Sequence, residues 1–166
     1  TEGRIQLGLS NTDHSQNLSH EVKAMVNFPV TDRLAVRAVV ALRNDAGFLD
    51  NLGTGTKGSN DSTVQGGRFL ASWDLTDNSR LEWMSLYQKI KNEDAFADRS
   101  DLGRYKRTGS INSPFETSVE LHNLKYTHYF SPATLTVSLT RKKKAQATFF
   151  DLSTNQAIQN IVLGGK

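Results

Sequence analysis

Apolar and polar residues alternate with a period of two in one segment after another of this chain. The clearest segment runs from Leu34 to Asn44, where one parity is entirely apolar from Leu34 to Leu42, while Arg37 and Arg43 take the other. Because successive side chains of a β-strand point to opposite faces, this period predicts strands with one apolar and one polar face. Further strands are predicted over residues 3–11, 21–28, 65–75, 80–88, 123–130 and 134–140. The chain is therefore predicted to hold about seven strands, with a possible eighth beyond residue 148.

The connections between these segments are of two kinds, short and long. The short ones, at residues 29–33, 76–79 and 129–133, carry Pro, Asp, Asn or Ser at positions that suit tight turns. The long ones, at residues 45–63 and 91–117, are rich in Gly, Asn, Asp and Ser. Short turns at one end, long loops at the other and strands of roughly 9–11 residues or more are typical of an outer-membrane barrel. We therefore predict an all-β fold, a segment of an antiparallel up-and-down transmembrane β-barrel with about 7–8 long strands, short periplasmic turns and long outer loops.

The composition agrees with a structure whose interior is polar. The chain has 166 residues, of which 37% are hydrophobic and 22% charged, which is poor for a large packed core but too rich in apolar residues for disorder. It has no apolar run of about 18 residues, so no transmembrane helix is predicted. The sequence opens within a predicted strand, and we expect the chain to be a piece of a longer protein. The absence of cysteine excludes disulfides and thiolate metal sites.

The charge pattern does not favour a nucleic-acid partner. The net charge is +3 and the basic residues are not concentrated on one aromatic-rich face. The stretch GTGTKG at residues 53–58 matches a dinucleotide-binding pattern, but the residues that follow do not form a convincing helix. We interpret it as a glycine-rich outer loop. No calcium-loop spacing, no metal-ligating histidine pair and no hydrolase motif is present, so neither an enzyme, a metal site nor a cofactor is predicted.

Residues 26–51 read VNFPVTDRLAVRAVVALRNDAGFLDN and combine three features: a turn with Pro, Thr and Asp, a Leu-Ala-x-Arg strand start, and a Gly-Phe-x-Asp-Asn segment where a loop begins. This combination resembles the hairpin that opens the barrel of TonB-dependent outer-membrane receptors of the iron-complex (siderophore) type. The residues that carry the resemblance are Val26, Asn27, Phe28, Pro29, Thr31, Asp32, Leu34, Ala35, Arg37, Arg43, Gly47, Phe48, Asp50 and Asn51. The hairpins over residues 66–88 and 123–140 are similar in a more generic way.

The resemblance implies a location and a transport function. Residues 1–166 would be part of a single β-barrel domain, the N-terminal barrel strands of a longer receptor in the bacterial outer membrane. The plug domain and the TonB-contacting box of the family are not in this chain. The implied function is energised uptake of an iron–siderophore complex or a similar bulky nutrient. The implied partners are the lipid bilayer and, in the full-length protein, the plug domain and TonB.

Two other classes of protein remain open at this point. The chain is also compatible with another outer-membrane barrel, a porin or an adhesin. A soluble all-β module that binds carbohydrate is the third hypothesis. Solubility without detergent would favour that third hypothesis over the two membrane proteins.

Candidate contact residues follow from the expected orientation. Ligand selection in receptors of this kind falls to outer loops, and the candidates there are Asp50, Asn51, Lys57, Asp94, Asp98, Arg104 and Tyr105. The run RKKK ends a strand that rises towards the outside, so we expect it to contact lipopolysaccharide phosphates. Its members are Arg141, Lys142, Lys143 and Lys144. The residues predicted to line the lumen are Arg37, Arg68, Glu82 and Lys125.

Aromatic residues gather beside the short turns. Phe28, Trp73, Tyr129 and Phe130 each lie within a few residues of one. Amphipathic rings prefer the boundary between lipid and water, so this placement predicts an aromatic girdle at the periplasmic interface.

Overall fold

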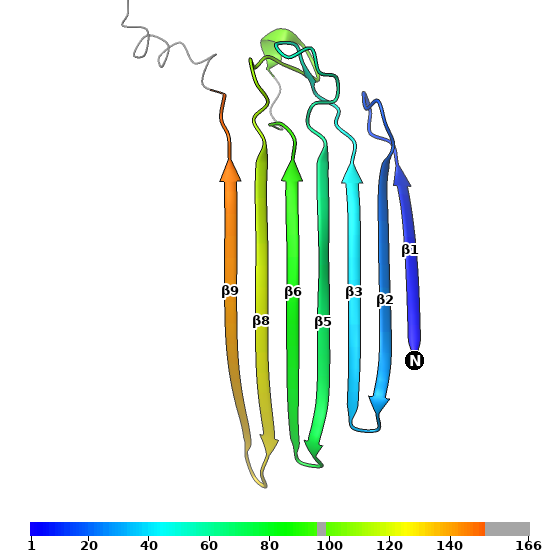
Figure 1. Cartoon of the computed structure of the whole chain (residues 1–166), viewed down its shortest axis with the longest axis vertical. Helices are drawn as coiled ribbons and strands as arrows, with labels where there is room; N and C mark the ends of the chain where they lie inside the picture. Colours follow the sequence, from blue (N-terminus) through cyan, green and yellow to red (C-terminus); the bar gives the residue numbers. More distant parts are fainter. Residues whose placement is uncertain (96–98, 152–166) are drawn as a thin grey trace, which may run out of the picture.

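The computed structural model describes residues 1–95 and 99–151 as an all-β structure (Figure 1). One antiparallel seven-stranded sheet has the order β1-β2-β3-β5-β6-β8-β9, so each long strand pairs with the next long strand along the chain. Its strands are β1 (Glu2–Ser10), β2 (Ser19–Thr31), β3 (Leu34–Asp45), β5 (Ser62–Thr76), β6 (Ser79–Asn92), β8 (Phe115–Tyr129) and β9 (Thr134–Thr148). The sheet is open, with β1 and β9 at its edges. The prediction of an all-β, antiparallel, up-and-down fold is confirmed.

Three short elements lie in the long loops. Strands β4 (Asp50–Asn51) and β7 (Lys106–Arg107) pair in parallel, and η1 (Ser100–Leu102) is a single 3₁₀ turn. No helix in the described part of the chain has the length and the hydropathy needed to span a membrane.

Two of the three tight turns between the long strands are held by a threonine hydroxyl. At the β2–β3 turn the Thr31 hydroxyl accepts hydrogen bonds from the backbone N–H groups of Arg33 and Leu34, at 3.2 and 3.0 Å. At the β5–β6 turn the Thr76 hydroxyl accepts the Asn78 N–H at 3.3 Å. Threonine therefore satisfies the exposed backbone donors at matching positions of successive hairpins. We call the end of the strands at which the tight turns lie the turn end, and the opposite end the loop end.

Two strands extend well beyond their predicted limits. The sequence pattern predicted strands over 123–130 and 134–140, whereas β8 begins at Phe115 and β9 continues to Thr148. In the added part of β9 both faces carry polar residues, so the two-residue period disappears although the backbone ladder continues. In the added part of β8 the period persists but is inverted, because Phe115, Val119 and Leu121 lie on the polar face. The RKKK run consequently lies in the middle of β9, and the prediction that it ends a strand is wrong. The predicted eighth strand lies outside the described residues from 152 onward.

The sheet has one apolar and one polar face. Directly paired residues of neighbouring strands lie on the same face, and one such row joins Phe28, Val36, Ala71, Trp83, Leu124 and Leu139. Fifteen large side chains on this apolar face are 41–77% exposed. They are Ile5, Leu7, Leu9, Val22, Val26, Phe28, Val40, Leu42, Trp73, Trp83, Tyr87, Leu124, Leu135, Val137 and Leu139.

Nothing within the described chain covers the apolar face. Among residues 1–95 and 99–151, the only buried hydrophobic residues are Ala46 and Leu49, and both lie in a loop rather than beneath the sheet. Water-exposed apolar surface costs about 25 cal/mol per Å² relative to burial. A continuous apolar surface of this extent therefore marks a contact with something other than the described residues.

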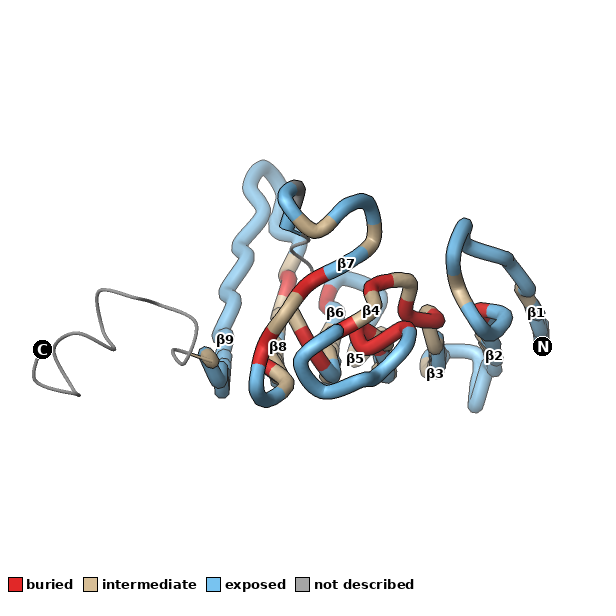
Figure 2. Tube along the Cα trace, turned by 90° about the horizontal axis from the view of Figure 1, so that it is seen from above, coloured by how far each residue is buried: buried red, intermediate tan, exposed pale blue. Residues whose placement is uncertain are grey.

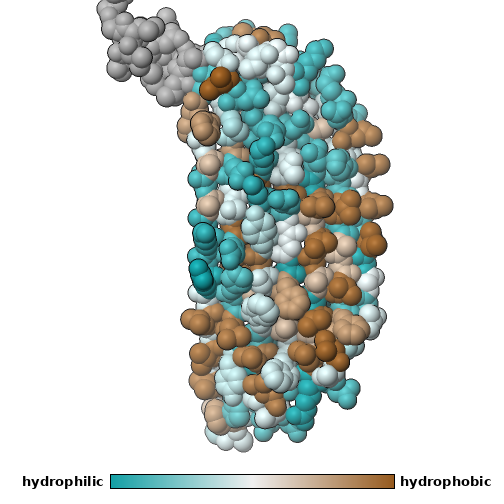
Figure 3. All heavy atoms as spheres, in the orientation of Figure 1, coloured by the Kyte–Doolittle hydropathy of each residue, from teal (hydrophilic) through white to brown (hydrophobic). Residues whose placement is uncertain are grey.

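The apolar residues form an oblique belt across their face. On β1 the belt extends towards the loop end as far as Leu9, which pairs with His20 of β2. On β9 it extends only as far as Leu139, and the row of paired residues that contains Leu139 crosses β2 at Phe28. The loop-end limit of the belt therefore shifts by eight residues along the strands, about 26 Å, between β1 and β9. These two strands are six strand spacings apart, about 29 Å. Figure 3 looks onto this face, where hydrophobic residues reach higher along β1 to β3 than along β8 and β9. The belt is inclined by about 42° to the rows of paired residues, which run perpendicular to the strands. A belt perpendicular to a barrel axis would make this same angle with the rows as the strands make with the axis, and strands in barrels tilt by roughly 35–45°.

Candidate functional site: a packed cap at the loop end

The two longest loops fold together into one unit. We call residues 46–61 and 93–114 the loop cap, of which residues 96–98 are not described. Strands β4 and β7 join its halves: Asp50 N–H donates to Tyr105 O at 2.8 Å, and Leu52 N–H donates to Arg107 O at 2.9 Å. Seen from above, buried residues gather in this cap rather than along the edge strands (Figure 2). The cap is the only part of the described chain with a buried interior of its own.

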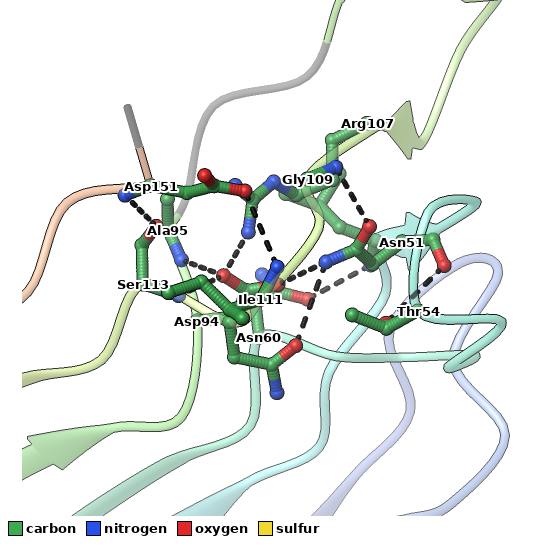
Figure 4. A network of polar contacts seen from close by, with 12 residues as sticks. Asn51, Thr54, Asn60, Asp94, Ala95, Arg107, Gly109, Ile111, Ser113 and Asp151 are labelled. Carbon is green, nitrogen blue, oxygen red and sulfur yellow. Dashed lines mark hydrogen bonds and ion pairs between the residues drawn. The ribbon is translucent and has the colours of Figure 1, made fainter. Parts of the chain in front are cut away.

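The centre of the cap is a buried ion pair. The Asp94 side chain is fully buried, and Arg107 is 8% exposed. One carboxylate oxygen of Asp94 accepts from the Arg107 guanidinium and from the backbone N–H groups of Ser113 and Ala95, at 2.8 and 2.9 Å for the two N–H groups (Figure 4). The other oxygen accepts from the Asn51 amide at 3.3 Å. Burying a charge is costly unless it is paired and hydrogen-bonded, and Asp94 meets both conditions.

Asn51 ties the two loops together through both ends of its amide. Its carbonyl oxygen accepts the backbone N–H groups of Gly53 and Gly109, at 3.1 and 3.0 Å. Its nitrogen donates to Asp94 and to Asn112 (Figure 4). One side chain therefore serves backbone groups from loops that are 58 residues apart in sequence.

Glycine is required where the backbones of the cap approach closely. A Cβ on Gly53 would lie 2.3 Å from Gly109 O, and one on Gly47 would lie 2.0 Å from Gly58 O. The GTGTKG stretch is thus a packed turn, closed by paired backbone hydrogen bonds between Asn51 and Thr56 at 2.8 and 3.1 Å. No phosphate-binding helix follows it, because β5 begins at Ser62.

Asn60 holds the start of the first cap loop. Its carbonyl oxygen accepts from the backbone N–H groups of Phe48 and Leu49, both at 2.8 Å. Its amide nitrogen and the hydroxyl of Ser59 are buried without a hydrogen-bond partner among the described residues. These two groups are the polar atoms of the cap that its own packing leaves unsatisfied.

A second, more exposed joint attaches the loop between β1 and β2 to the cap. The His14 ring stacks on Tyr105 at 5.1 Å between centroids, and its Nε2 lies 3.2 Å from an Asp50 carboxylate oxygen. The Tyr105 hydroxyl donates to Asp13 at 3.0 Å and accepts from Arg104 at 2.8 Å. Both His14 and Tyr105 have positive φ, 67° and 61°, a conformation that costs a non-glycine residue free energy. The polar groups of this joint satisfy one another.

Acidification should loosen this joint. Partial burial opposes ionisation of Asp50, but the Gly58 N–H, His14 and Lys57 together hold the pKa of its carboxyl below the usual 3.8. A lowered folded-state pKa gives stability that is fully present above 3.8 and is lost as the pH falls below that value. We expect the melting temperature of the native protein to exceed that of an Asp50→Asn variant at pH 6, with the difference shrinking below about pH 3.8. A difference that stays constant down to pH 3 would contradict this assignment.

The predicted ligand candidates divide into three groups. Asp50, Arg104 and Tyr105 meet at the exposed joint, and Lys57 is exposed on a turn nearby. Asn51 and Asp94 are 1% and 0% exposed, so in this structure they hold the cap together instead of facing outward. Asp98 lies outside the described residues. The sequence reasoning missed Arg107, His14 and Phe48, because a single polar or aromatic residue in a long loop carries no periodic signal.

The polar face carries an excess of positive charge. Arg37, Arg68, Glu82 and Lys125 all lie on this face, opposite the apolar belt, as predicted. Four of its five acidic residues on the described strands, Glu21, Asp45, Asp74 and Glu82, are each paired with a neighbouring cation at 2.5–2.7 Å, and the fifth is Glu2. Among the described residues, five further cations of this face form no ion pair: Arg4, Arg37, Arg68, Lys142 and Lys144.

The RKKK run is divided between the faces. On the apolar face, Arg141 and Lys143 lie opposite His122 and Glu120 in the backbone ladder. On the polar face, Lys142 and Lys144 lie opposite Leu121 and Val119. All four were predicted to contact lipopolysaccharide together. Because alternate residues of a strand face opposite ways, they cannot do so as one cluster.

No protein-family model, curated protein or solved structure matches this chain. Within residues 1–95 and 99–151, no group of three or more His, Asp or Glu side chains is arranged to hold a metal ion. What the chain does is therefore inferred from its own residues.

Proposed function

We propose that this chain forms part of the wall of an outer-membrane β-barrel receptor of the TonB-dependent type, which takes up an iron–siderophore complex or a similarly bulky nutrient. The observation that carries the proposal is the uncovered apolar belt on one face of an otherwise polar, up-and-down sheet. Lipid covers such a belt in a membrane barrel, and the polar face then lines the lumen. A soluble sheet protein would instead bury the apolar face in a core.

The geometry of the belt supports a tilted wall. Strands in a closed barrel are inclined to its axis, so the lipid boundary crosses the rows of paired residues obliquely. The belt of this chain is oblique in this manner, with a slope of about 42° estimated from strand spacings. Within lipid every backbone polar group needs a partner, which the antiparallel ladders supply between neighbouring strands.

The loop end supports a receptor rather than a simple pore. The long loops form a cap with a buried ion pair, which gives the outer surface a defined shape on which a bulky ligand can be selected. The cations left unpaired on the polar face favour an anionic occupant of the lumen. The first hairpin, over residues 26–51, is the part that resembles TonB-dependent receptors.

Two measurements on the protein as its gene encodes it test the proposal. Fractionation of the native bacterium should place the protein in the outer membrane, from which carbonate does not extract it. Disrupting the gene should abolish uptake of a radioactive ferric chelate under iron limitation, and disrupting TonB should have the same effect. A soluble protein would overturn the membrane part. An outer-membrane protein whose disruption left energised uptake unchanged would point to the porin or adhesin class.

A further inference from the structure

The charged residues of the apolar face occur in one region only. On the described strands this face carries six of them: Lys89, Lys91, Glu116, Glu120, Arg141 and Lys143. All lie on β6, β8 and β9, towards the loop end, where the oblique belt has already stopped. The turn-end half of the face has none in the described chain. On β6, β8 and β9, charged residues therefore begin directly beyond the loop-end limit of the belt, and none lies beyond its turn-end limit on the described strands.

Within this region Arg141 and Lys143 differ from the other cations. Lys89 is bound to Glu116 at 2.8 Å and Lys91 to Glu93 at 2.7 Å. Arg141 and Lys143 make no ion pair among the described residues, and both are exposed. Glu120, directly across the ladder from Lys143, instead contacts His122 at 2.8 Å. Arg141 and Lys143 lie about 7 Å apart along their strand.

Their position next to the belt suits a molecule with both charged and apolar parts. Leu139, at the upper limit of the belt, is 72% exposed and lies two residues before Arg141 on the same face. An acyl chain lying against Leu139 and Val137 would bring its headgroup to the level of Arg141 and Lys143. Phosphate is the headgroup anion that Arg and Lys bind most readily, through charge-assisted hydrogen bonds.

We propose that Arg141 and Lys143 bind the phosphates of lipid A, the phosphorylated glycolipid of the outer leaflet, and that Lys142 and Lys144 do not. The inference rests on the proposed function, which directs the loop end outward. The sequence predicted that all four residues of the RKKK run contact lipopolysaccharide. The proposal keeps only the two whose side chains lie on the apolar face.

The alternation of the run supplies a matched control. Arg141→Gln with Lys143→Gln removes two positive charges from the apolar face, and Lys142→Gln with Lys144→Gln removes two from the polar face of the same strand. The probe is the purified full-length protein in bilayers of phosphatidylcholine containing either lipid A or an equal charge of phosphatidylglycerol. We expect the first double variant to bind lipid A about tenfold more weakly and the second to bind it like the native protein.

Each outcome decides between the alternatives. Equal losses in both double variants, or no loss in either, would overturn the assignment. Equal binding of phosphatidylglycerol and lipid A by the native protein would overturn the commitment to lipid A. Native heat-modifiable migration of both variants in gels shows that the comparison is made between folded proteins. Failure of the native protein to insert into any bilayer would instead contradict the proposed function itself.

Discussion

Replacing Asp94 by asparagine should destabilise the loop cap by about 3 kcal/mol, because the buried Arg107 loses the carboxylate that pairs with it directly and keeps only the weaker attraction of Asp151. The expected result is faster hydrogen exchange at the backbone amides that this network holds, those of Gly53, Gly109 and Ser113. The strands should keep their protection, since their ladders do not involve Asp94. The cap would then open as a unit while the sheet remains folded.

Asp101 provides the matched control for that experiment. It also lies in the second cap loop and also pairs with an arginine, Arg99, at 2.7 Å, but both side chains are about half exposed. Asp101→Asn should therefore leave the exchange of the cap amides unchanged. Adding Arg107→Gln to Asp94→Asn should restore part of the lost protection, because it removes the unpaired charge. Equal effects of the two single substitutions would show that burial of the Asp94 pair is not what holds the cap.

Placing an arginine at Ala38 should destabilise the inserted protein by about 2–4 kcal/mol, because the new charge would lie within the lipid-facing belt. Ala38 is on the apolar face, between Val26 and Phe69 in its row. Ala35→Arg is the control: the same substitution on the same strand, three residues away, with its side chain on the polar face beside Ser72. Denaturant unfolding in bilayers measures both.

The two substitutions distinguish a membrane wall from a soluble sheet. In lipid, Ala38→Arg alone should lower the free energy of unfolding, with Ala35→Arg close to the native protein. If the protein is soluble and its apolar face is free, both should be tolerated nearly equally, since long charged side chains on an exposed sheet face cost little. That second result would also remove the basis for the lipid A site.

The strands and their order could be predicted because their information is local. A period of two over β3 needs no knowledge of its neighbours, and the Pro, Asp and Thr of the turns act on their own backbone. The prediction failed in the second half of β9, where both faces are polar, and in the first half of β8, where the apolar residues lie on the opposite face to the belt. There the backbone pairing of the adjacent strand, and no pattern of side chains, continues the ladder. The division of the RKKK run was missed for that reason.

The interior of the cap could not be predicted from the sequence. Asp94 and Arg107 look like ordinary solvated loop residues, since nothing local distinguishes them from Asp101 or Arg104. Their burial results from the parallel pairing of β4 with β7, strands of two residues each. A pairing that short has no periodicity to detect. Asn51 and Asp94, which the sequence suggested as ligand contacts, are the least exposed of the candidates that the structure describes.

The oblique belt determines how tolerance to substitution should be mapped over this sheet. Ile5 and Lys143 occupy one continuous row of paired residues, yet one lies inside the belt and the other beyond its limit. In the proposed barrel, a row of hydrogen-bonded neighbours would therefore pass from hydrocarbon into the headgroup layer as it crosses the wall. Positions of equal depth are found by moving along the sheet diagonally, with a shift of one or two residues at every strand. If the free energies of unfolding from a scan of charged substitutions are ordered by depth in this way, they should change smoothly. The same values ordered by hydrogen-bonded row should not.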